Sequence, residues 1–432
     1  MKNTPPRIEL LAPAGGWPQL HAAVNAGADS VFFGVDRFNM RTRAKNFTLD
    51  ELADVTSCAH EKEVRACLTL NTIIYESELN DMEDTVRAAK AAKVDAVIAS
   101  DFAVLAAAKR HSLPVHISTQ LSASNSEALA FLFALGVRRV VLARECTLED
   151  LISIKSNLRE RLGEEADDFK LEVFAHGAMC VAVSGRCFMS GFESGRSANR
   201  GDCAQPCRRS YRISSERGGG GFALEEGHVL SPKDLCTLPF LEQLLDAGVD
   251  CLKIEGRNRS PDYVHTVVKT YRQALDFYQA HRQDSDFISR FDELKTRGMT
   301  EISTVYNRGF SEGFYMGKPL GDWTTFPGNQ SSHRREYIGQ VLHIHPNSGR
   351  ITLRLESTGI TVGEEVFVEN AELGYHPFAV EEMWRDAEEV STVEKGQCVD
   401  LPPHPPLRLS DRIYRLRPVS SGNRPDQSEN LH

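Results

Sequence analysis

Ala23–Gly34 (AVNAGADSVFFG) sets a pattern that returns as Ala88–Ser100 (AAKAAKVDAVIAS), Leu132–Ala143 (LFALGVRRVVLA) and Leu244–Gly256 (LLDAGVDCLKIEG). Each stretch has the pattern of a helix end, a tight turn at a small residue and a buried strand. Strands that alternate with helices in this way predict a parallel sheet covered by helices. Because the pattern echoes along the chain, we expect a closed (β/α)8 barrel of the TIM type, not an open doubly wound sheet.

The remaining strands and helices of this barrel follow from apolar runs and amphipathic stretches. The expected strands are Ile8–Ala12, Ser30–Gly34, Arg65–Leu70, Ala96–Ala99, Val115–Thr119, Arg139–Ala143, Leu171–Ala175 and, as the eighth, Cys251–Glu255. The expected helices are Trp17–Ala26, Leu49–Glu61, Leu79–Ala92, Phe102–Lys109, Glu127–Leu135 and Leu148–Leu158. No GxGxxG follows the first strand, which argues against a dinucleotide-binding fold.

Two regions depart from the repeat and define the expected domains. Residues 177–231 are rich in Gly, Ser, Arg and Cys and read as an insertion within a barrel domain at 1–323. Residues 337–419 alternate apolar and polar residues between Pro and Gly turns, which predicts a small antiparallel β-barrel domain. Polar residues 324–336 are the expected linker, and 420–432 an expected disordered tail.

The composition narrows the class of protein. The chain of 432 residues is 41% hydrophobic and 25% charged, and its net charge is 50 − 60 = −10. Uniform coating of nucleic acid or of an anionic membrane is therefore disfavoured, although a local basic patch is compatible with this total. No apolar run approaches the roughly 20 residues of a membrane span, and the N-terminus lacks a signal-peptide pattern. We expect a cytoplasmic protein that does not associate with membranes.

Four of the ten cysteines cluster in the insertion. Six residues separate Cys180 from Cys187, fifteen separate Cys187 from Cys203, and three separate Cys203 from Cys207. Four thiolates can complete a tetrahedral metal site or hold an iron–sulfur cluster, and the spacing lacks the paired CxxC of common zinc ribbons. The spacing alone leaves zinc, a cluster and four unligated thiols open.

The same segment is locally basic. Between residues 186 and 217, seven arginines, Arg208 among them, stand against three carboxylates, a balance of +4. Guanidinium groups pair with phosphates and carboxylates through two hydrogen bonds at once, so Arg208 is a candidate for substrate binding. A solvated loop that offsets acidic neighbours is the equally weighted alternative.

Polar residues at the ends of the expected strands are the other candidates, because barrel active sites form at that face. They are Gln120, Arg144, His176, Lys253, Glu255 and Arg257. Alternation along the last strand points Lys253, Glu255 and Arg257 to one side, toward the lumen or mouth. A buried Lys–Glu pair is also a common structural feature. Neither HExxH nor GxSxG occurs, so the familiar protease motifs are absent.

At Glu172–Ser190 the sequence EVFAHGAMCVAVSGRCFMS resembles the signature of the collagenase-like U-type peptidase family, whose peptidase mechanism is unknown. Supporting resemblances are LLAPAG at Leu10–Gly15, STQLSASN at Ser118–Asn125, GDCAQPCR at Gly201–Arg208, SPKDLC, KIEGR at Lys253–Arg257 and YNRGFSEGF at Tyr306–Phe314. They span residues 8–315, and the trailing β-domain resembles the C-terminal domain of the family.

The resemblance implies a function other than the one in the family's name. Bacterial members support oxygen-independent, prephenate-dependent hydroxylation of the tRNA wobble uridine or of an rRNA cytidine. A shorter pair hydroxylates the ubiquinone ring and carries [4Fe–4S] clusters. Carried over, the resemblance makes Cys180, Cys187, Cys203 and Cys207 cluster ligands. The layout of the chain is most similar to the tRNA hydroxylation group, although the stretch between Cys207 and KIEGR is shorter here than in some of its members.

The leading hypothesis is therefore a tRNA hydroxylase with an iron–sulfur cluster, prephenate as co-substrate and an electron donor yet to be identified. Strand-end position makes His176, Lys253 and Glu255 the catalytic candidates and Gln120, Arg144 and Arg257 the substrate-binding ones. The arginine-rich segment adds Arg208 to the substrate-binding candidates. The alternatives are a collagenase-like peptidase and a zinc-stabilised RNA-binding or assembly module. The sequence leaves the oligomeric state open, as well as whether Cys236 can replace Cys207 as a ligand.

Overall fold

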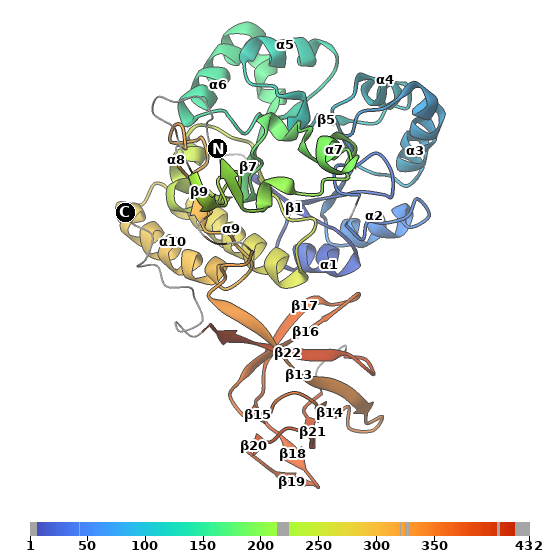
Figure 1. Cartoon of the computed structure of the whole chain (residues 1–432), viewed down its shortest axis with the longest axis vertical. Coiled ribbons are helices and arrows are strands. Elements are labelled where there is room, and N and C mark those ends of the chain that lie inside the picture. Colours follow the sequence, from blue (N-terminus) through green and yellow to red (C-terminus); the bar gives the residue numbers. More distant parts are fainter. Residues whose placement is uncertain are drawn as a thin grey trace. The chain divides into compact units, whose positions relative to one another are not determined.

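The computed structural model describes residues 7–42, 44–213, 224–319, 321–324, 326, 328–403 and 407–419. The expected tail at 420–432 lies outside the described residues. The chain divides into two compact units (Figure 1). The first comprises residues 1–302 and 307–330, and the second residues 303–306 and 331–432. The stretch expected to be a linker thus divides between the units, with residues 324–330 in the first and 331–336 in the second.

The first unit is built on the expected closed barrel. Eight parallel strands pair in sequence, and the last strand closes the ring by pairing with both the first and the seventh. They are β1 (Glu9–Pro13), β2 (Ser30–Phe33), β3 (Arg65–Leu70), β4 (Ala96–Ala99), β5 (Val115–Ile117), β6 (Arg139–Val141), β7 (Lys170–Ala178) and β11 (Cys251–Ile254). The prediction of a TIM-like barrel, with its eighth strand at Cys251, is confirmed.

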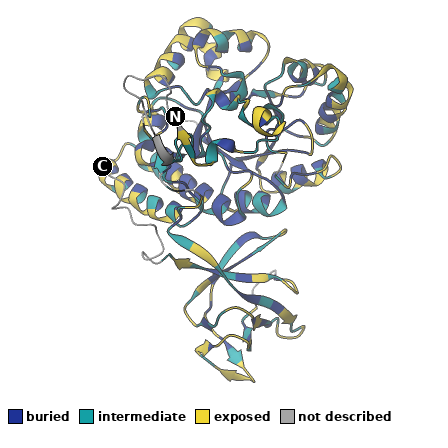
Figure 2. Ribbon diagram, in the orientation of Figure 1, coloured by how far each residue is buried: buried dark blue, intermediate teal, exposed yellow. Residues whose placement is uncertain are grey.

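Helices follow the strands and cover the barrel, each with a buried inner and an exposed outer face (Figure 2). They are α1 (Trp17–Asn25), α2 (Leu52–His60), α3 (Leu79–Ala91), α4 (Phe102–Arg110), α5 (Ser126–Ala134), α6 (Leu148–Leu162), α8 (Leu241–Asp246), α9 (Pro261–His281) and α10 (Phe287–Ser303). Local sequence fixes several of their starts: the Asp101 and Asn125 side chains cap α4 and α5, and Thr147 with Asp150 forms a capping box on α6.

The insertion leaves the barrel at the carboxyl end of β7. Its described part contains α7 (Met189–Ser194), short 3-10 turns, and a hairpin of β8 (Tyr211–Ile213) and β9 (Leu224–Gly227). The chain then returns as β10 (Asp234–Cys236), antiparallel to β7, and β12 (Phe310–Ser311) pairs with β10. Because β7 is also a barrel strand, this pairing anchors both ends of the insertion at the mouth of the barrel.

A group of charged side chains lies in the half of the barrel nearer the amino ends of its strands. We call Glu9, Arg65, Arg139, Glu172 and Lys253 the floor group. Arg139 Nη1 donates to Glu9 Oε1 at 2.9 Å and lies 3.6 Å from Glu172 Oε2, and Lys253 Nζ donates to Glu172 Oε1 at 2.8 Å. Arg65 and the second Arg139 nitrogen also bond Glu9. Buried charges persist only when they are paired, and here each buried carboxylate has a cationic partner.

The second unit is antiparallel, as its alternating sequence predicts. Its main sheet has eight strands in the order β17, β16, β22, β13, β14, β21, β18, β19. Their bounds are β13 (His333–Ile344), β14 (Ile351–Leu355), β16 (Glu365–Asn370), β17 (Gly374–Ala379), β18 (Trp384–Arg385), β19 (Glu388–Glu389), β21 (Cys398–Leu401) and β22 (Arg412–Pro418). A two-stranded ladder joins β15 (Ile360–Thr361) to β20 (Thr392–Val393). Among the described pairings none joins β17 to β19, so the main ladder stays open at its edges.

One face of this sheet covers a core of aliphatic side chains that includes Ile338, Leu353 and Val368. None of the helices in the described part of the chain has both the length and the apolar character needed to cross a bilayer.

Candidate functional site at the barrel mouth

A small pocket opens at the carboxyl ends of the barrel strands. It is lined by Phe32, Met40, Arg41, Thr69, Asn71, Ile98, Thr119, Gln120, Arg144, Phe174, Lys253, Glu255 and Arg257. Five of the seven residues predicted from strand-end position or arginine content are therefore brought together here: Gln120, Arg144, Lys253, Glu255 and Arg257. The free space is about 40 Å³, room for no more than a few water molecules. A larger ligand enters only if lining side chains move aside.

Three arginines surround one carboxylate in this pocket. We call Arg41, Arg144, Arg257 and Glu255 the mouth group. Arg41 Nη2 lies 3.0 Å from Glu255 Oε1. Burial by itself raises the pKa of Glu255, but the charges of Arg41, Arg144 and Arg257 outweigh burial and lower that pKa below its usual value. Glu255 is thus an anion, and the mouth group carries a surplus of two positive charges (3 − 1).

Arg257 is the most deeply held of the three arginines. Nη1 donates to Thr69 Oγ1 at 2.9 Å, Nη2 donates to Asn39 Oδ1 at 2.9 Å and also bonds Asn46, and Nε has no hydrogen-bond partner in the structure. Burial, with Arg41 as the next cause, lowers its pKa to about 9. Because its partners are neutral, the Arg257 charge is oriented without being cancelled.

The fold leaves room for Arg257 by means of two glycines. A Cβ on Gly34, at the end of β2, would overlap the Arg257 guanidinium, and a Cβ on Gly15 would overlap its backbone carbonyl. Neither position has space for another residue. The glycine of the LLAPAG motif therefore has a packing role beside the mouth.

Arg144 and Gln120 complete the upper wall. The Arg144 guanidinium stacks on the Phe174 ring, 4.0 Å from its centroid, and Nη1 makes a long hydrogen bond of 3.4 Å to Ala178 O. Its buried Nε has no hydrogen-bond partner in the structure, and burial lowers its pKa. Gln120 Oε1 accepts from Asn71 Nδ2 at 3.2 Å and from Ser118. An anion that reached Arg144 would supply the acceptor that its Nε lacks.

Lys253 links the mouth to the floor group. Its ammonium lies over the Phe32 ring at 4.5 Å from the centroid, while the Glu172 carboxylate takes its hydrogen bond. Lys253 does form a buried Lys–Glu pair, but its partner is Glu172 rather than Glu255. Glu255 instead pairs with Arg41.

The four clustered cysteines lie together beside the mouth group. Burial is the main cause that raises the pKa of Cys207; the nearby Arg208 lowers that pKa, and the neighbouring Cys180, Cys203 and Cys187 raise it further. The charges of Cys180 and Cys203 also raise the pKa of Arg41, after the larger effect of Glu255. Arg41 is thus close to both the cysteines and the pocket.

Four thiols in one segment are the donor set both of a zinc site and of an iron–sulfur cluster. All four thiols are free and half-buried, and backbone amides already point at two sulfurs: Met189 N lies 3.4 Å from Cys187 Sγ and Gln205 N lies 3.4 Å from Cys203 Sγ. Among the described residues, no group of three or more His, Cys, Asp or Glu side chains lies close enough to hold a metal ion.

Two predicted residues lie elsewhere. The His176 ring packs against Tyr263, Tyr271 and Phe310, and it does not line the pocket. Burial, together with Arg259, lowers its pKa to about 3, so at neutral pH it has no proton to donate as an imidazolium.

Arg208 likewise serves the loop rather than the pocket. Its guanidinium donates to Ser231 Oγ at 2.9 Å, to Pro232 O at 2.7 Å and to Met179 O at 2.6 Å. These bonds tie the turn that carries Cys207 to the end of β7 and to the chain leading into β10. Arg208 thus holds the cysteines in place.

Arg41 is the main residue that the sequence interpretation missed. It lies in the loop after β2, in FNMRTRAKNF, outside every motif quoted above. The signal that could have found it is its place in a loop after a strand, since such loops form the active-site face of a barrel. Asn39 and Asn46, from the same loop, position Arg257.

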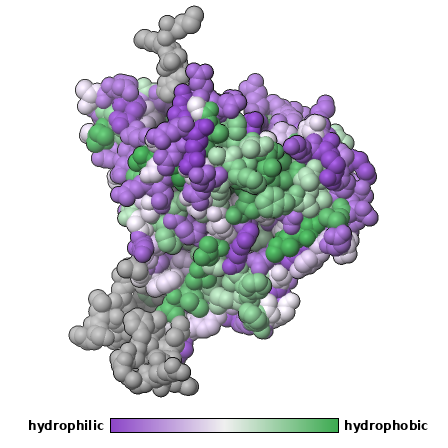
Figure 3. Space-filling view, turned by 90° about the horizontal axis from the view of Figure 1, so that it is seen from above, coloured by the Kyte–Doolittle hydropathy of each residue, from purple (hydrophilic) through white to green (hydrophobic). Residues whose placement is uncertain are grey.

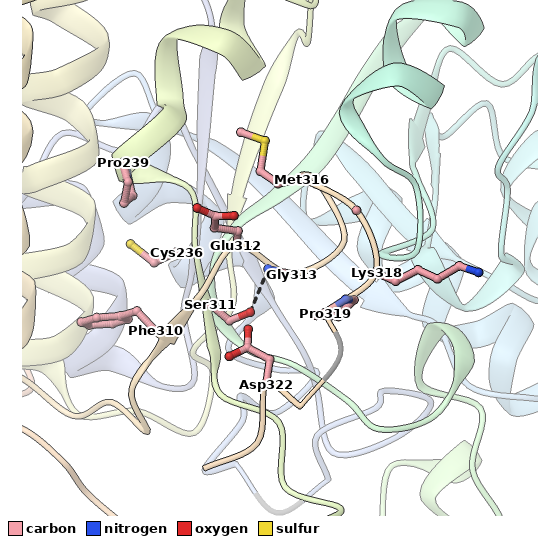
Figure 4. Close-up of a pocket in the computed structure, with 11 residues that line it drawn as sticks. Cys236, Pro239, Phe310, Ser311, Glu312, Gly313, Met316, Lys318, Pro319 and Asp322 are labelled. Carbon is pink, nitrogen blue, oxygen red and sulfur yellow. Dashed lines mark hydrogen bonds between the residues drawn. The ribbon is translucent and has the colours of Figure 1, made fainter. Parts of the chain in front are cut away.

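A larger cavity of about 400 Å³ lies apart from these residues (Figure 4). It is lined by Cys236, Pro239, Phe310, Ser311, Glu312, Gly313, Met316, Gly317, Lys318, Pro319 and Asp322. Cys236 itself is buried, with its sulfur 3.8 Å from the Tyr271 hydroxyl and 3.7 Å from Met299 Sδ. Its surroundings are therefore those of a core thiol, away from the four clustered cysteines.

Comparison with known proteins fits this architecture. The sequence model of peptidase family U32 matches residues 15–325. A Porphyromonas gingivalis protein named collagenase is 38% identical over 412 residues, covering 95% of this chain and 98% of its own. The Bacillus subtilis tRNA hydroxylation protein P1 is 31% identical over 424 residues, covering 96% and 94%. The Escherichia coli 23S rRNA 5-hydroxycytidine C2501 synthase is 34% identical over 330 residues, covering 73% and 48%. The chain belongs to the peptidase U32 family.

Proposed function

We propose that this protein is an RNA hydroxylase that acts on the wobble uridine of tRNA in the cytoplasm. The observation that carries the proposal is the mouth group, in which three arginines surround one carboxylate beside four cysteines. Relatives named as tRNA and rRNA hydroxylation proteins support the same class of reaction.

The charge of the mouth indicates the class of co-substrate. A surplus of two positive charges in a largely buried pocket is costly until an anion offsets it. A small dianion such as prephenate, which has two carboxylates, would balance that surplus. Arg144 offers its unpartnered Nε and Arg257 its oriented charge. Arg41 is 31% exposed, so it is the lining arginine best able to move and admit the ligand.

We assign Cys180, Cys187, Cys203 and Cys207 to a [4Fe–4S] cluster. Such a cluster supplies one-electron transfer when it is bound. The chain's own contribution is to hold the thiols together through Arg208 and to keep Arg41 between them and Glu255. The partner that exchanges electrons with the cluster is a protein or small donor still to be identified.

The RNA has to present one base to a narrow barrel mouth. A base stacked in a helix cannot reach it, so the target base must be unstacked, as bases in an anticodon loop readily are. Glu255 is an anion at neutral pH and is the candidate proton acceptor at the pocket.

The test is an anaerobic purification followed by metal analysis and complementation. A brown protein with about four irons and four sulfides per chain, and restoration of wobble 5-hydroxyuridine by mass spectrometry of tRNA from a deletion strain, are the expected results. Unmodified wobble uridine in the complemented strain would contradict the proposal. Colourless protein with stoichiometric zinc and no turnover would indicate the zinc-stabilised RNA-binding module instead.

A collagenase-like peptidase is the second candidate, because the relative named collagenase covers 95% of this chain at 38% identity. This function predicts that highly purified protein cleaves gelatin and that Glu255→Gln abolishes the cleavage. Gelatinase activity that is unchanged in Glu255→Gln would point to a contaminating protease.

A further inference from the structure

Exposed apolar side chains gather in patches on the surface seen in Figure 3. The two most exposed large hydrophobic residues of the described chain are Phe192, at 89%, and Phe188, at 71%. Phe192 lies in α7, and Phe188 is the N-cap residue just before it. Both are on the segment that carries the clustered cysteines. Helix α7 is drawn as exposed in Figure 2, in front of the barrel. Two largely exposed phenylalanines at and just before a short helix contribute little to folding and suggest binding.

The helix has two faces with different tasks. Ser190, on the inner face, is buried; its hydroxyl lies 3.8 Å from Cys203 Sγ and accepts from Ala204 N at 3.1 Å. Phe188 and Phe192 are four residues apart, so they share the other face, with ring centroids 6.2 Å apart at an interplanar angle of 49°. The inner face of the helix thus contacts Cys203, and the outer face carries the two rings.

The surroundings of the rings are cationic. From Arg186 to Arg212 the chain has six arginines and two carboxylates, a balance of 6 − 2 = +4. Arg186 is exposed, and Arg209 and Arg196 pair with the surface carboxylates Glu193 and Asp202. Exposed pairs of this kind are weak and exchange readily for a phosphate.

A third exposed aromatic side chain adjoins the same segment. Arg200 stacks over the Tyr75 ring, 4.6 Å from its centroid, and donates to Glu78 Oε2 at 2.7 Å. Tyr75 is 56% exposed. Aromatic rings interleaved with arginines are the features by which proteins bind unpaired nucleotides, the rings stacking on bases and the arginines meeting phosphates. A protein partner would require a broader, continuous apolar area than two isolated rings provide.

We propose that Phe188 and Phe192, flanked by Arg186, form a stacking platform for unpaired bases of a single-stranded RNA loop. The identity of the RNA rests on the proposed function. The platform adds to that function the residues that bind the loop. It lies on the outward face of the segment whose inward face carries the cysteines. Bases stacked there would hold their neighbour near the barrel mouth.

The test measures binding separately from modification. Anaerobically purified full-length protein is titrated against a fluorescein-labelled anticodon stem–loop RNA, and against the same stem closed by a tight loop without unpaired bases. Phe188→Ala and Phe192→Ala should each weaken stem–loop binding on the order of tenfold, with little effect on the closed stem. Phe131→Ala is the matched control, because Phe131 is also a largely exposed phenylalanine, on α5.

Leucine variants separate stacking from simple apolar contact. Phe192→Leu keeps an apolar side chain but lacks the ring, so it should bind the stem–loop nearly as weakly as Phe192→Ala. If the leucine variant binds like the wild type, stacking is excluded and an apolar docking face for a protein is indicated. Equal affinity of the wild type for both RNAs, or no binding of either, would also overturn the platform. If the wild type restores wobble hydroxylation and both alanine variants bind the stem–loop as tightly as the wild type, only the platform is overturned. If the wild type fails to restore wobble hydroxylation, the proposed function is overturned.

Discussion

The barrel contains two charged groups that differ in their balance. In the floor group the two buried carboxylates, Glu9 and Glu172, are matched by buried Arg139 and Lys253, and the third cation, Arg65, is half-exposed to solvent. In the mouth group three arginines share the single carboxylate of Glu255. A balanced group needs nothing further and stabilises the fold, whereas a surplus of buried charge is tolerated where a ligand offsets it. This difference is the reason we propose the mouth as the functional end of the barrel.

Removing a proposed cluster ligand should have the largest effect on activity. It would test whether function is confined to the mouth end of the barrel. Cys180→Ala should lose the iron and abolish RNA hydroxylation, because Cys180 adjoins the mouth arginines. Cys236→Ala is the control, since Cys236 packs against Tyr271 and Met299, and it should keep its iron. Iron analysis and tRNA mass spectrometry on both variants decide. A fully active Cys180→Ala protein without iron would refute the cluster assignment.

Breaking the floor group should destabilise the protein without a specific effect on binding. Glu172→Ala leaves Lys253 and Arg139 buried without their carboxylate and should lower the free energy of unfolding by about 3–5 kcal/mol in urea denaturation. Asp84→Ala, which breaks an exposed ion pair with Arg87, should cost about 0–1 kcal/mol. Similar losses in the two variants would mean that the floor is not a buried structural network.

Removing one positive charge from the mouth group should have the opposite result, a loss of activity without a loss of stability. Arg144→Gln should leave the free energy of unfolding unchanged or raise it, because burial already lowers the pKa of Arg144 and its Nε has no partner. The same change should lower kcat/KM on the order of 100-fold by removing a contact to the anionic co-substrate. Urea denaturation and steady-state kinetics test the two parts. Lost stability with full activity would reverse the roles we assign to the two groups.

The last effect concerns the buried His176 and is absent at neutral pH. Its pKa of about 3 in the folded state lies below the unfolded value of about 6.5, so unfolding takes up a proton between these pH values. Above about pH 6.5 the neutral ring costs no stability. Below it, the free energy of unfolding falls by about 1.4 kcal/mol per pH unit until the folded-state pKa is reached, because only the unfolded chain binds the proton. His176→Phe should lessen this slope without abolishing it, because burial also lowers the pKa of His116 to about 3 and that ring contributes in the same pH range. The variant should keep hydroxylation, because aromatic rings already surround the site.

Chemical denaturation across this pH range measures the slope. His343→Phe, at an exposed histidine, should leave it unchanged. Loss of hydroxylation in His176→Phe with an intact fold would restore His176 as a proton-transfer group, in line with the assignment made from its strand-end position.

Several mouth residues could be predicted because a parallel barrel brings all strand ends to one face. Lys253, Glu255 and Arg257 follow from alternation on one strand, and Arg144 from the end of another. The sequence also placed His176 at a strand end, but β7 continues to Ala178, β10 pairs beside His176, and aromatic side chains enclose the ring. Arg41 was missed because its loop has no strand periodicity to orient it.

The sequence by itself determined the barrel, its eight strands and the grouping of four cysteines in one insertion, because helix and strand periods and residue spacing are local properties. Only the tertiary structure decided which charges meet. It paired Lys253 with Glu172, gave Glu255 to three arginines, turned Arg208 inward and left Phe188 and Phe192 outside. Electrostatic partners depend on distances between residues far apart in the chain, which no local pattern encodes.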